Sequence, residues 1–92
     1  MNKNFEKGLK ALYAGNLVEA DGLFSKAVSD DPHNFEAYFY RGKTRWQQNS
    51  YAAAINDFQK VLELNPNHNQ AQISIDMIKQ ILAFRNPDMY NV

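Results

Sequence analysis

The segments LVEADGLFSKAVSDDP, residues 17–32, and YAAAINDFQKVLELNP, residues 51–66, are two versions of one pattern, and they decide the fold. In each version a small Ala is followed four residues later by Phe and, after eight more residues, by Pro. One constant offset, that from Leu17 to Tyr51, relates the two versions. Their apolar residues recur at the i, i+3, i+4, i+7 spacing of one helical face. The pattern therefore predicts an amphipathic helix that occurs twice and ends before Pro.

The same offset relates the residues that precede each segment. Phe5 recurs as Phe39, and Gly8 recurs as Gly42. A period of about 34 residues that contains two helices is typical of stacked helical arrays. Arrays of this kind present surfaces to partners, so the period favours a binding role over a catalytic one.

Turn-forming residues divide the chain into five predicted helices. Gly15-Asn16 and Asn49-Ser50 interrupt the helical pattern inside the two copies. Pro32 and Pro66 end the pattern between copies, because the residue before Pro avoids the α region. The predicted N-caps are Asn16, in a capping-box variant with Glu19, then Asn34, Ser50 and, for the fifth helix, Asn67 or Gln70. The predicted helices are 2–14, 17–30, 35–48, 51–64 and 69–84.

These residues resemble the tetratricopeptide repeat family. The family has small residues where this chain has Gly8 and Ala20, an aromatic residue at the place of Phe24, and Pro at the place of Pro32. The resemblance implies an all-α fold of antiparallel helix-turn-helix repeats in a right-handed superhelix. It also implies a helical repeat domain over residues 1–85 and a C-terminal tail over residues 86–92. Within the domain, the implied units are repeat one, 1–34, repeat two, 35–68, and a capping helix, 69–85.

Three basic residues depart from the family pattern. Lys7 and Arg41 stand where the family usually has Leu, and Arg45 stands where it usually has Tyr. Long basic side chains can lay their stems on apolar surface and keep their charged ends in water. We therefore expect the first helix of each repeat to pack less tightly than in a consensus repeat.

The resemblance also implies where a partner binds. In this family the first helices of the repeats line a concave groove, and here those helices are unusually apolar. The implied partner is a peptide or helix segment of another protein, with Lys43 able to hold a carboxylate. Aromatic residues such as Phe5 and Phe39 often serve only in packing, so that reading stays open. The predicted groove residues are Phe5, Leu9, Leu12, Phe39, Lys43, Trp46, Ile73 and Met77.

The fifth helix carries two apolar stripes, one of Ile73, Met77, Ile81 and Phe84 and one of Ile75, Ile78 and Leu82. One stripe suffices to cover the second repeat. The other is either covered by the tail with Met89, Tyr90 and Val92, used in a homodimer, or seated deep in a small core. Structural self-association is thus the alternative function. Its predicted residues are Ile78, Ile81, Leu82 and Tyr90.

Composition argues against several other functions. Ten basic and ten acidic residues cancel, so we expect no binding to nucleic acid or to a membrane surface. The chain has no Cys and no long apolar run. These features favour a cytoplasmic protein. His33 and His68 lie in equivalent loops, where capping or solvent exposure is more common than catalysis. We expect no catalytic residue, no metal site and no cofactor, and a small enzyme is only a remote alternative.

Overall fold

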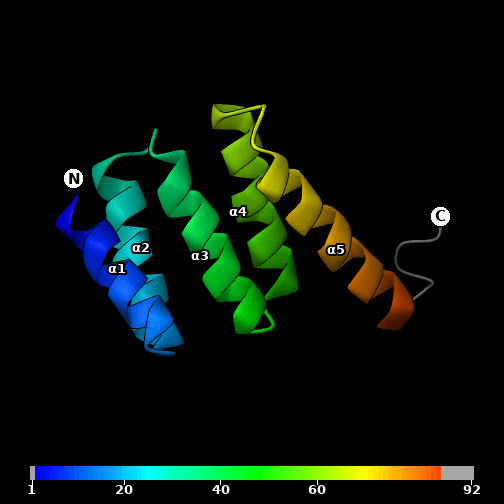
Figure 1. The fold of residues 1–92 in the computed structure, drawn as a ribbon, viewed down its shortest axis with the longest axis horizontal. Coiled ribbons are helices and arrows are strands. Elements are labelled where there is room, and N and C mark those ends of the chain that lie inside the picture. The colour runs from blue at the N-terminus through cyan, green and yellow to red at the C-terminus, as the bar shows by residue number, and fades with distance from the viewer. Residues whose placement is uncertain (1, 86–92) are drawn as a thin grey trace.

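A computed structural model describes residues 2–85 and shows five α-helices in that part of the chain (Figure 1). Each bound lies within one residue of its prediction, and the described residues contain no strand. The all-α prediction is therefore confirmed. The helices are α1 (Lys3–Tyr13), α2 (Leu17–Asp30), α3 (Phe35–Gln47), α4 (Tyr51–Leu64) and α5 (Asn69–Arg85).

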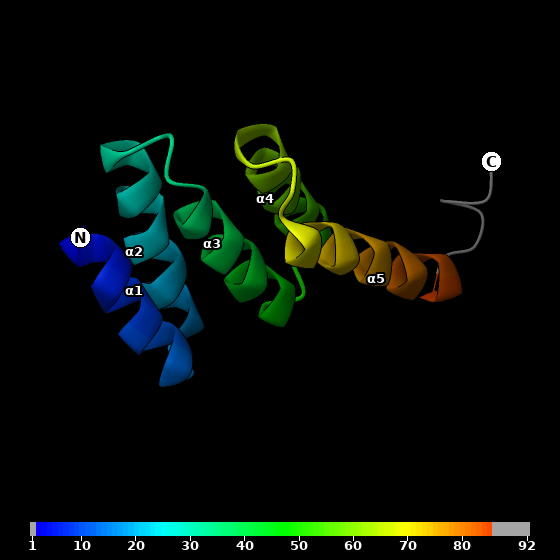
Figure 2. The same ribbon diagram turned by 45° about the horizontal axis from the view of Figure 1, so that its top comes forward.

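The helices form a linear stack in which each helix packs against the one that precedes it in the sequence. Helices α1 and α2 make one antiparallel hairpin, and α3 and α4 make the next. Helix α1 also contacts α3, so the first helices of the two hairpins are neighbours. Helix α5 packs against α4 and runs away from α3 toward its C-terminal end (Figures 1 and 2). One side of α5 is therefore left without a helical neighbour in the described chain.

The turns repeat with the same period as the helices. Gly15, in the first hairpin, has φ +82°, and Asn49, at the equivalent place in the second hairpin, has φ +63°. Both residues adopt the left-handed conformation that Gly and Asn tolerate best. The loops 31–34 and 65–68 also match, since in each the amide of the fourth residue donates to the carbonyl of the first at 3.1 Å. The sequence period is thus a period of the backbone.

In each hairpin, a Gly of the first helix lies directly against a Phe ring of the second helix. A Cβ atom added to Gly8 would lie 2.6 Å from Cε1 of Phe24, and one added to Gly42 would lie 2.9 Å from Cε1 of Phe58. Both Phe side chains are fully buried. The small residue is therefore needed because the ring of the second helix occupies the space where a side chain would stand.

The helix caps agree only in part with the sequence prediction. Asn34 caps α3 as predicted, because its Oδ1 accepts a hydrogen bond from the amide of Ala37 at 3.4 Å. Asn16 and Ser50 stand at the N-cap positions of α2 and α4, but neither side chain makes a capping hydrogen bond. The predicted capping box at Asn16 was therefore wrong. Both residues follow a left-handed residue and have ψ of 76° and 70°, well short of the extended value seen at Asn2, 126°.

Helix α5 is capped by His68 rather than by Asn67 or Gln70. Nδ1 of His68 accepts a hydrogen bond from the amide of Ala71 at 3.1 Å. The imidazole ring also lies 4.7 Å from the ring of Phe39, measured between centroids. His68 thus joins the start of α5 to the preceding hairpin, which corrects the predicted cap.

Candidate functional site

Three of the predicted groove residues lie in the core. Phe5, Leu12 and Phe39 are each only 5–6% exposed. The ring of Tyr40 lies between the two hairpins, with its centroid 5.8 Å from that of Phe5 and 5.4 Å from that of Phe39. These three side chains therefore offer little surface to a partner. The burial of Phe5 and Phe39 agrees with the alternative in which they serve in packing.

The accessible part of the predicted groove consists of Ile73, which is 55% exposed, and a row of three side chains at one repeat position. Leu9 on α1, Lys43 on α3 and Met77 on α5 are equivalent residues of successive copies. Leu9 and Lys43 are half-buried, and Met77 is 48% exposed. Trp46 is half-buried against Phe58, with ring centroids 6.5 Å apart. The row places a cation between two apolar side chains.

Lys43 is positioned by two aromatic rings. Its Nζ lies 5.6 Å from the ring centroid of Phe39 and 5.5 Å from that of Tyr40, distances at which a cation is attracted to the ring face. Among residues 2–85, no carboxylate lies within ion-pair distance of Nζ. Burial, followed by the effects of Tyr13, raises the pKa of the Tyr40 phenol, so the ring beneath Lys43 is neutral at pH 7. The ammonium group is thus held in place with capacity for an external anion.

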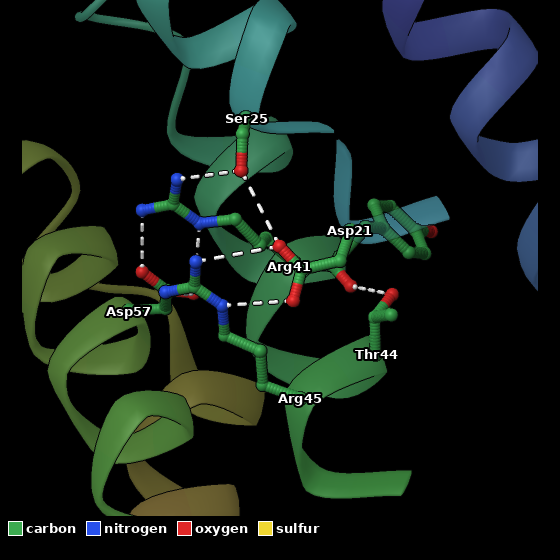
Figure 3. Close-up of polar contacts among 7 residues, drawn as sticks. Asp21, Ser25, Arg41, Thr44, Arg45 and Asp57 are labelled. Carbon is green, nitrogen blue, oxygen red and sulfur yellow. Dashed lines mark hydrogen bonds and ion pairs between the residues drawn. The ribbon is translucent and has the colours of Figure 1, made fainter. Parts of the chain in front are cut away.

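A partly buried ion-pair network joins three helices, and the sequence analysis missed it (Figure 3). Asp57, on α4, is 3% exposed. Its carboxylate accepts hydrogen bonds from Nη2 of Arg41 at 2.8 Å, from Nε of Arg41 at 3.0 Å and from Nη1 of Arg45 at 3.3 Å. Both Arg residues come from α3. Their guanidinium groups therefore converge on one carboxylate, contrary to our expectation that the basic ends lie in water.

The network continues into α2. Nε and Nη2 of Arg45 donate to Asp21 at 3.2 and 3.3 Å, and Nη1 of Arg41 donates to the hydroxyl of Ser25 at 3.3 Å. Burial lowers the pKa of Arg41, but the hydrogen bonds and charge of Asp57 outweigh this effect and leave the pKa above its ordinary value. The two hairpins are thereby tied together through α2, α3 and α4. The groups bind one another, so the arrangement serves packing rather than chemistry.

One signal in the sequence points to this network. Asp57 interrupts the apolar run Ala54, Ile55, Phe58 and Val61 on the buried face of α4. A buried carboxylate requires a partner, because an unpaired charge in the core is very costly. The partners lie 16 and 12 residues away on α3, and the packing of α3 against α4 within the second hairpin brings them together.

The predicted self-association residues fall into different environments. Ile78 is fully buried against α4, and Leu82 is half-buried in the same cluster. Ile81 is half-buried, and Tyr90 lies outside the described residues. In the predicted stripe that contains Ile81, Ile73 is 55% exposed, Met77 48% and Phe84 89%. The stripe of Ile78 and Leu82 therefore covers the core, and the deep seating considered for the other stripe is not observed.

The described residues show neither a metal-binding cluster nor a helix that could span a membrane. In the part of the chain from residue 2 to residue 85, no three His, Cys, Asp or Glu side chains gather closely enough to hold a metal ion. None of the described helices combines the length and the apolar character that crossing a bilayer requires.

Comparison with known proteins agrees with the geometry. A family model described as tetratricopeptide repeat matches residues 5–72. The chain is 36% identical over 73 residues to DnaJ homolog subfamily C member 3 of Bos taurus. The matched segment covers 79% of this chain and 14% of that relative. It is 39% identical over 67 residues to PEX5-related protein of Rattus norvegicus. That match covers 73% of this chain and 11% of the relative. The chain thus spans less than a sixth of the length of these two relatives.

Proposed function

Because the chain belongs to the tetratricopeptide repeat family, we propose that it is a protein-interaction module whose first helices bind an apolar segment of a partner that carries a carboxylate. The observation that supports this proposal best is the row of Leu9, Lys43 and Met77 across α1, α3 and α5. An apolar side chain of the partner would pack on Leu9 or Met77, and its carboxylate would pair with Lys43.

The packing of the helices suggests a spacing for the partner's residues. Packed helices lie about 8–10 Å apart, and an extended chain advances about 3.3–3.6 Å per residue. Helix α1 contacts α3, so Leu9 and Lys43 are separated by about one such step. An extended partner would therefore place its apolar residue and its acidic residue about three positions apart. The wider divergence of α5 allows a longer interval to Met77 (Figure 1).

Half-buried Lys43 is the anchor that this proposal can test most directly. A charged pair at the rim of an interface contributes little, whereas a pair that is shielded from water contributes more. Lys43 is half-buried over two rings and so belongs to the shielded kind. We expect its charge to select acidic residues in the partner rather than to supply most of the affinity.

The experiment is selection of random peptides displayed on phage, followed by affinity measurement with synthetic peptides. We expect selected sequences to share an apolar residue and an acidic residue about three positions apart. Lys43→Met keeps the aliphatic stem on the rings and removes the charge, and it should weaken these peptides about 5- to 20-fold, as for a charge-assisted contact. Lys26→Met, on the exposed face of α2, is the matched control and should leave affinity unchanged. Equal affinity of the Lys43→Met variant and the parent chain would refute the assigned face.

A further inference from the structure

Helix α5 carries an apolar surface that the described chain leaves open. We define the α5 stripe as Ile73, Met77, Ile81 and Phe84, which recur at the three- and four-residue spacing of one helical face. Of these, Ile73 is 55% exposed, Met77 48% and Phe84 89%. The opposite face of α5, with Ile75 and Ile78, is buried against α4. The stripe is therefore a second apolar face and not part of the packing on α4.

The two repeats show what covers this surface when a neighbour is present. Phe5, Phe39 and Ile73 occupy the same repeat position in successive copies. Phe5 is 5% exposed and contacts the ring of Tyr40 on α3, and Phe39 is 6% exposed and contacts the ring of His68 at the start of α5. Ile73 is 55% exposed, and within residues 2–85 no helix follows α5. Ile73 thus occupies a stacking position that a following helix covers in the two earlier copies.

A head-to-tail stack of copies does not supply that helix. The face at the other end of the stack belongs to α1, where Lys3, Lys7 and Lys10 are exposed. Burying three ammonium groups against an apolar stripe would cost far more than the contact returns. The α5 stripe is better matched by itself, because it contains no charged side chain and the chain has no net charge to oppose association.

We propose that the α5 stripe is covered by the α5 stripe of a second copy of this chain, with the two helices antiparallel across a two-fold axis. In this arrangement Ile73 faces Phe84 of the second copy and Met77 faces Ile81, so every apolar side chain of the stripe meets another. A two-fold contact uses the same surface twice and closes after two copies. The inference goes beyond the proposed peptide-binding face, since Ile73, Ile81 and Phe84 have no part in it. Met77 belongs to both surfaces, so a peptide that packs on Met77 would compete with the second copy.

The size of the contact sets the expected affinity. Helix α5 has 17 residues and is therefore about 25 Å long, at about 1.5 Å per residue. One helix face per copy lies toward the small end of specific interfaces, which begin at about 1,200 Å² in total. We expect a dissociation constant in the micromolar range rather than a permanent dimer.

Sedimentation equilibrium of the 92-residue chain over a concentration series tests the proposal. The parent chain should pass from monomer to dimer at micromolar concentration, and Phe84→Glu should weaken the dimer at least tenfold. Phe84 is 89% exposed, so the substitution leaves the core intact, as circular dichroism will show. The matched control is Val18→Glu, at an 82% exposed position on α2, which should leave the dimer unchanged. A parent chain that stays monomeric at about 1 mM, or equal loss in both variants, would overturn the inference.

Cross-linking tests the antiparallel direction separately. The chain contains no Cys, so introduced thiols have no competing partner. A mixture of Ile73→Cys and Phe84→Cys chains should form a disulfide between the two variants much faster than either variant forms one with itself. Faster linkage of each variant to itself would instead indicate parallel helices and overturn the proposed arrangement. At concentrations where the parent chain is monomeric, Phe84→Glu should bind the selected peptides with the affinity of the parent chain, so loss of the dimer and loss of the peptide-binding face are distinguishable.

Discussion

Replacing Asp57 with Ala should destabilise this protein more than replacing Asp21, the other carboxylate of the network. The carboxylate is almost fully buried and accepts three hydrogen bonds, two from Arg41 and one from Arg45. Its loss leaves two guanidinium groups without the carboxylate that they share. Removal of one partner from a fully buried ion pair costs about 3–5 kcal/mol.

Two features reduce this cost. The side chains of Arg41 and Arg45 are 15% and 24% exposed, so both can regain some water. Arg45 also keeps Asp21, and Arg41 keeps the Ser25 hydroxyl. We therefore expect Asp57→Ala to lower the free energy of unfolding by about 2–3 kcal/mol, out of about 5–15 kcal/mol for a domain of this kind. The midpoint of thermal unfolding should fall by about 10–20 °C.

Urea unfolding followed by far-UV circular dichroism measures this change. Asp76→Ala is the matched control, since it gives the same gain in helix propensity at an exposed position whose one side-chain partner among residues 2–85 is Gln72. Asp21→Ala should fall between the two, because it removes hydrogen bonds only from Arg45 and Ser25. The reasoning fails if Asp57→Ala costs less than about 1 kcal/mol relative to Asp76→Ala, the level of an exposed ion pair.

Three further predictions concern the packing. Gly8→Ala should cost about 1–3 kcal/mol in urea unfolding because a Cβ atom there meets a buried ring at 2.6 Å, whereas Gly22→Ala, in open space on α2, should stabilise the helix by about 0.5–1 kcal/mol. The pKa of Tyr40 is higher in the folded protein than in the unfolded chain, where it is about 10. The resulting stability is fully present below the unfolded pKa and is lost as pH rises through the folded pKa. Tyr40→Phe should therefore flatten the decline of the urea midpoint above about pH 10. His68→Ala should increase amide hydrogen exchange in α5 and lower stability by about 1 kcal/mol through the lost cap, whereas His33→Ala, at an exposed loop position, should change neither.

The backbone of this protein could be predicted because its signals are local and occur twice. Gly15 and Asn49 turn the chain, and Pro32 and Pro66 follow the ends of α2 and α4. Each acts through the torsion angles of one or two residues, which the residue type alone restricts. The repeat period then transfers whatever is true of the first hairpin to the second.

The side-chain environments could be predicted only where one helix decides them. The two stripes of α5 were separable from the sequence, and Ile75 and Ile78 are buried as one stripe requires. By contrast, the burial of Phe5 depends on Tyr40, which comes from a different hairpin. The pairing of Asp57 with Arg41 likewise depends on the stacking of α3 on α4. Contacts of this kind follow from the tertiary arrangement and have no local pattern.

The capping errors have a local origin, the geometry of the loop that precedes each helix. Asn16 has the residue type of an N-cap, but it directly follows Gly15 in a two-residue turn with positive φ. Its ψ of 76° is set by that turn, and its side chain makes no capping hydrogen bond. His68 is not among the residues preferred at an N-cap, yet the loop 65–68 places Nδ1 on the amide of Ala71. In both helices the geometry of the preceding loop decides whether a side chain reaches the helix end.

The stack is held unequally along its length, and this bears on which surface is used for binding. The ion-pair network fixes α2, α3 and α4 to one another, so Lys43 on α3 stands on a rigid part of the molecule. Helix α5 lies outside the network and depends on its packing against α4 and on the cap by His68. A rigid anchor favours recognition of a partner with little ordering cost, whereas a helix with one open apolar face gains stability from whatever covers it. Lys43 is thus suited to selecting a ligand, and the α5 stripe is suited to a contact that completes the fold.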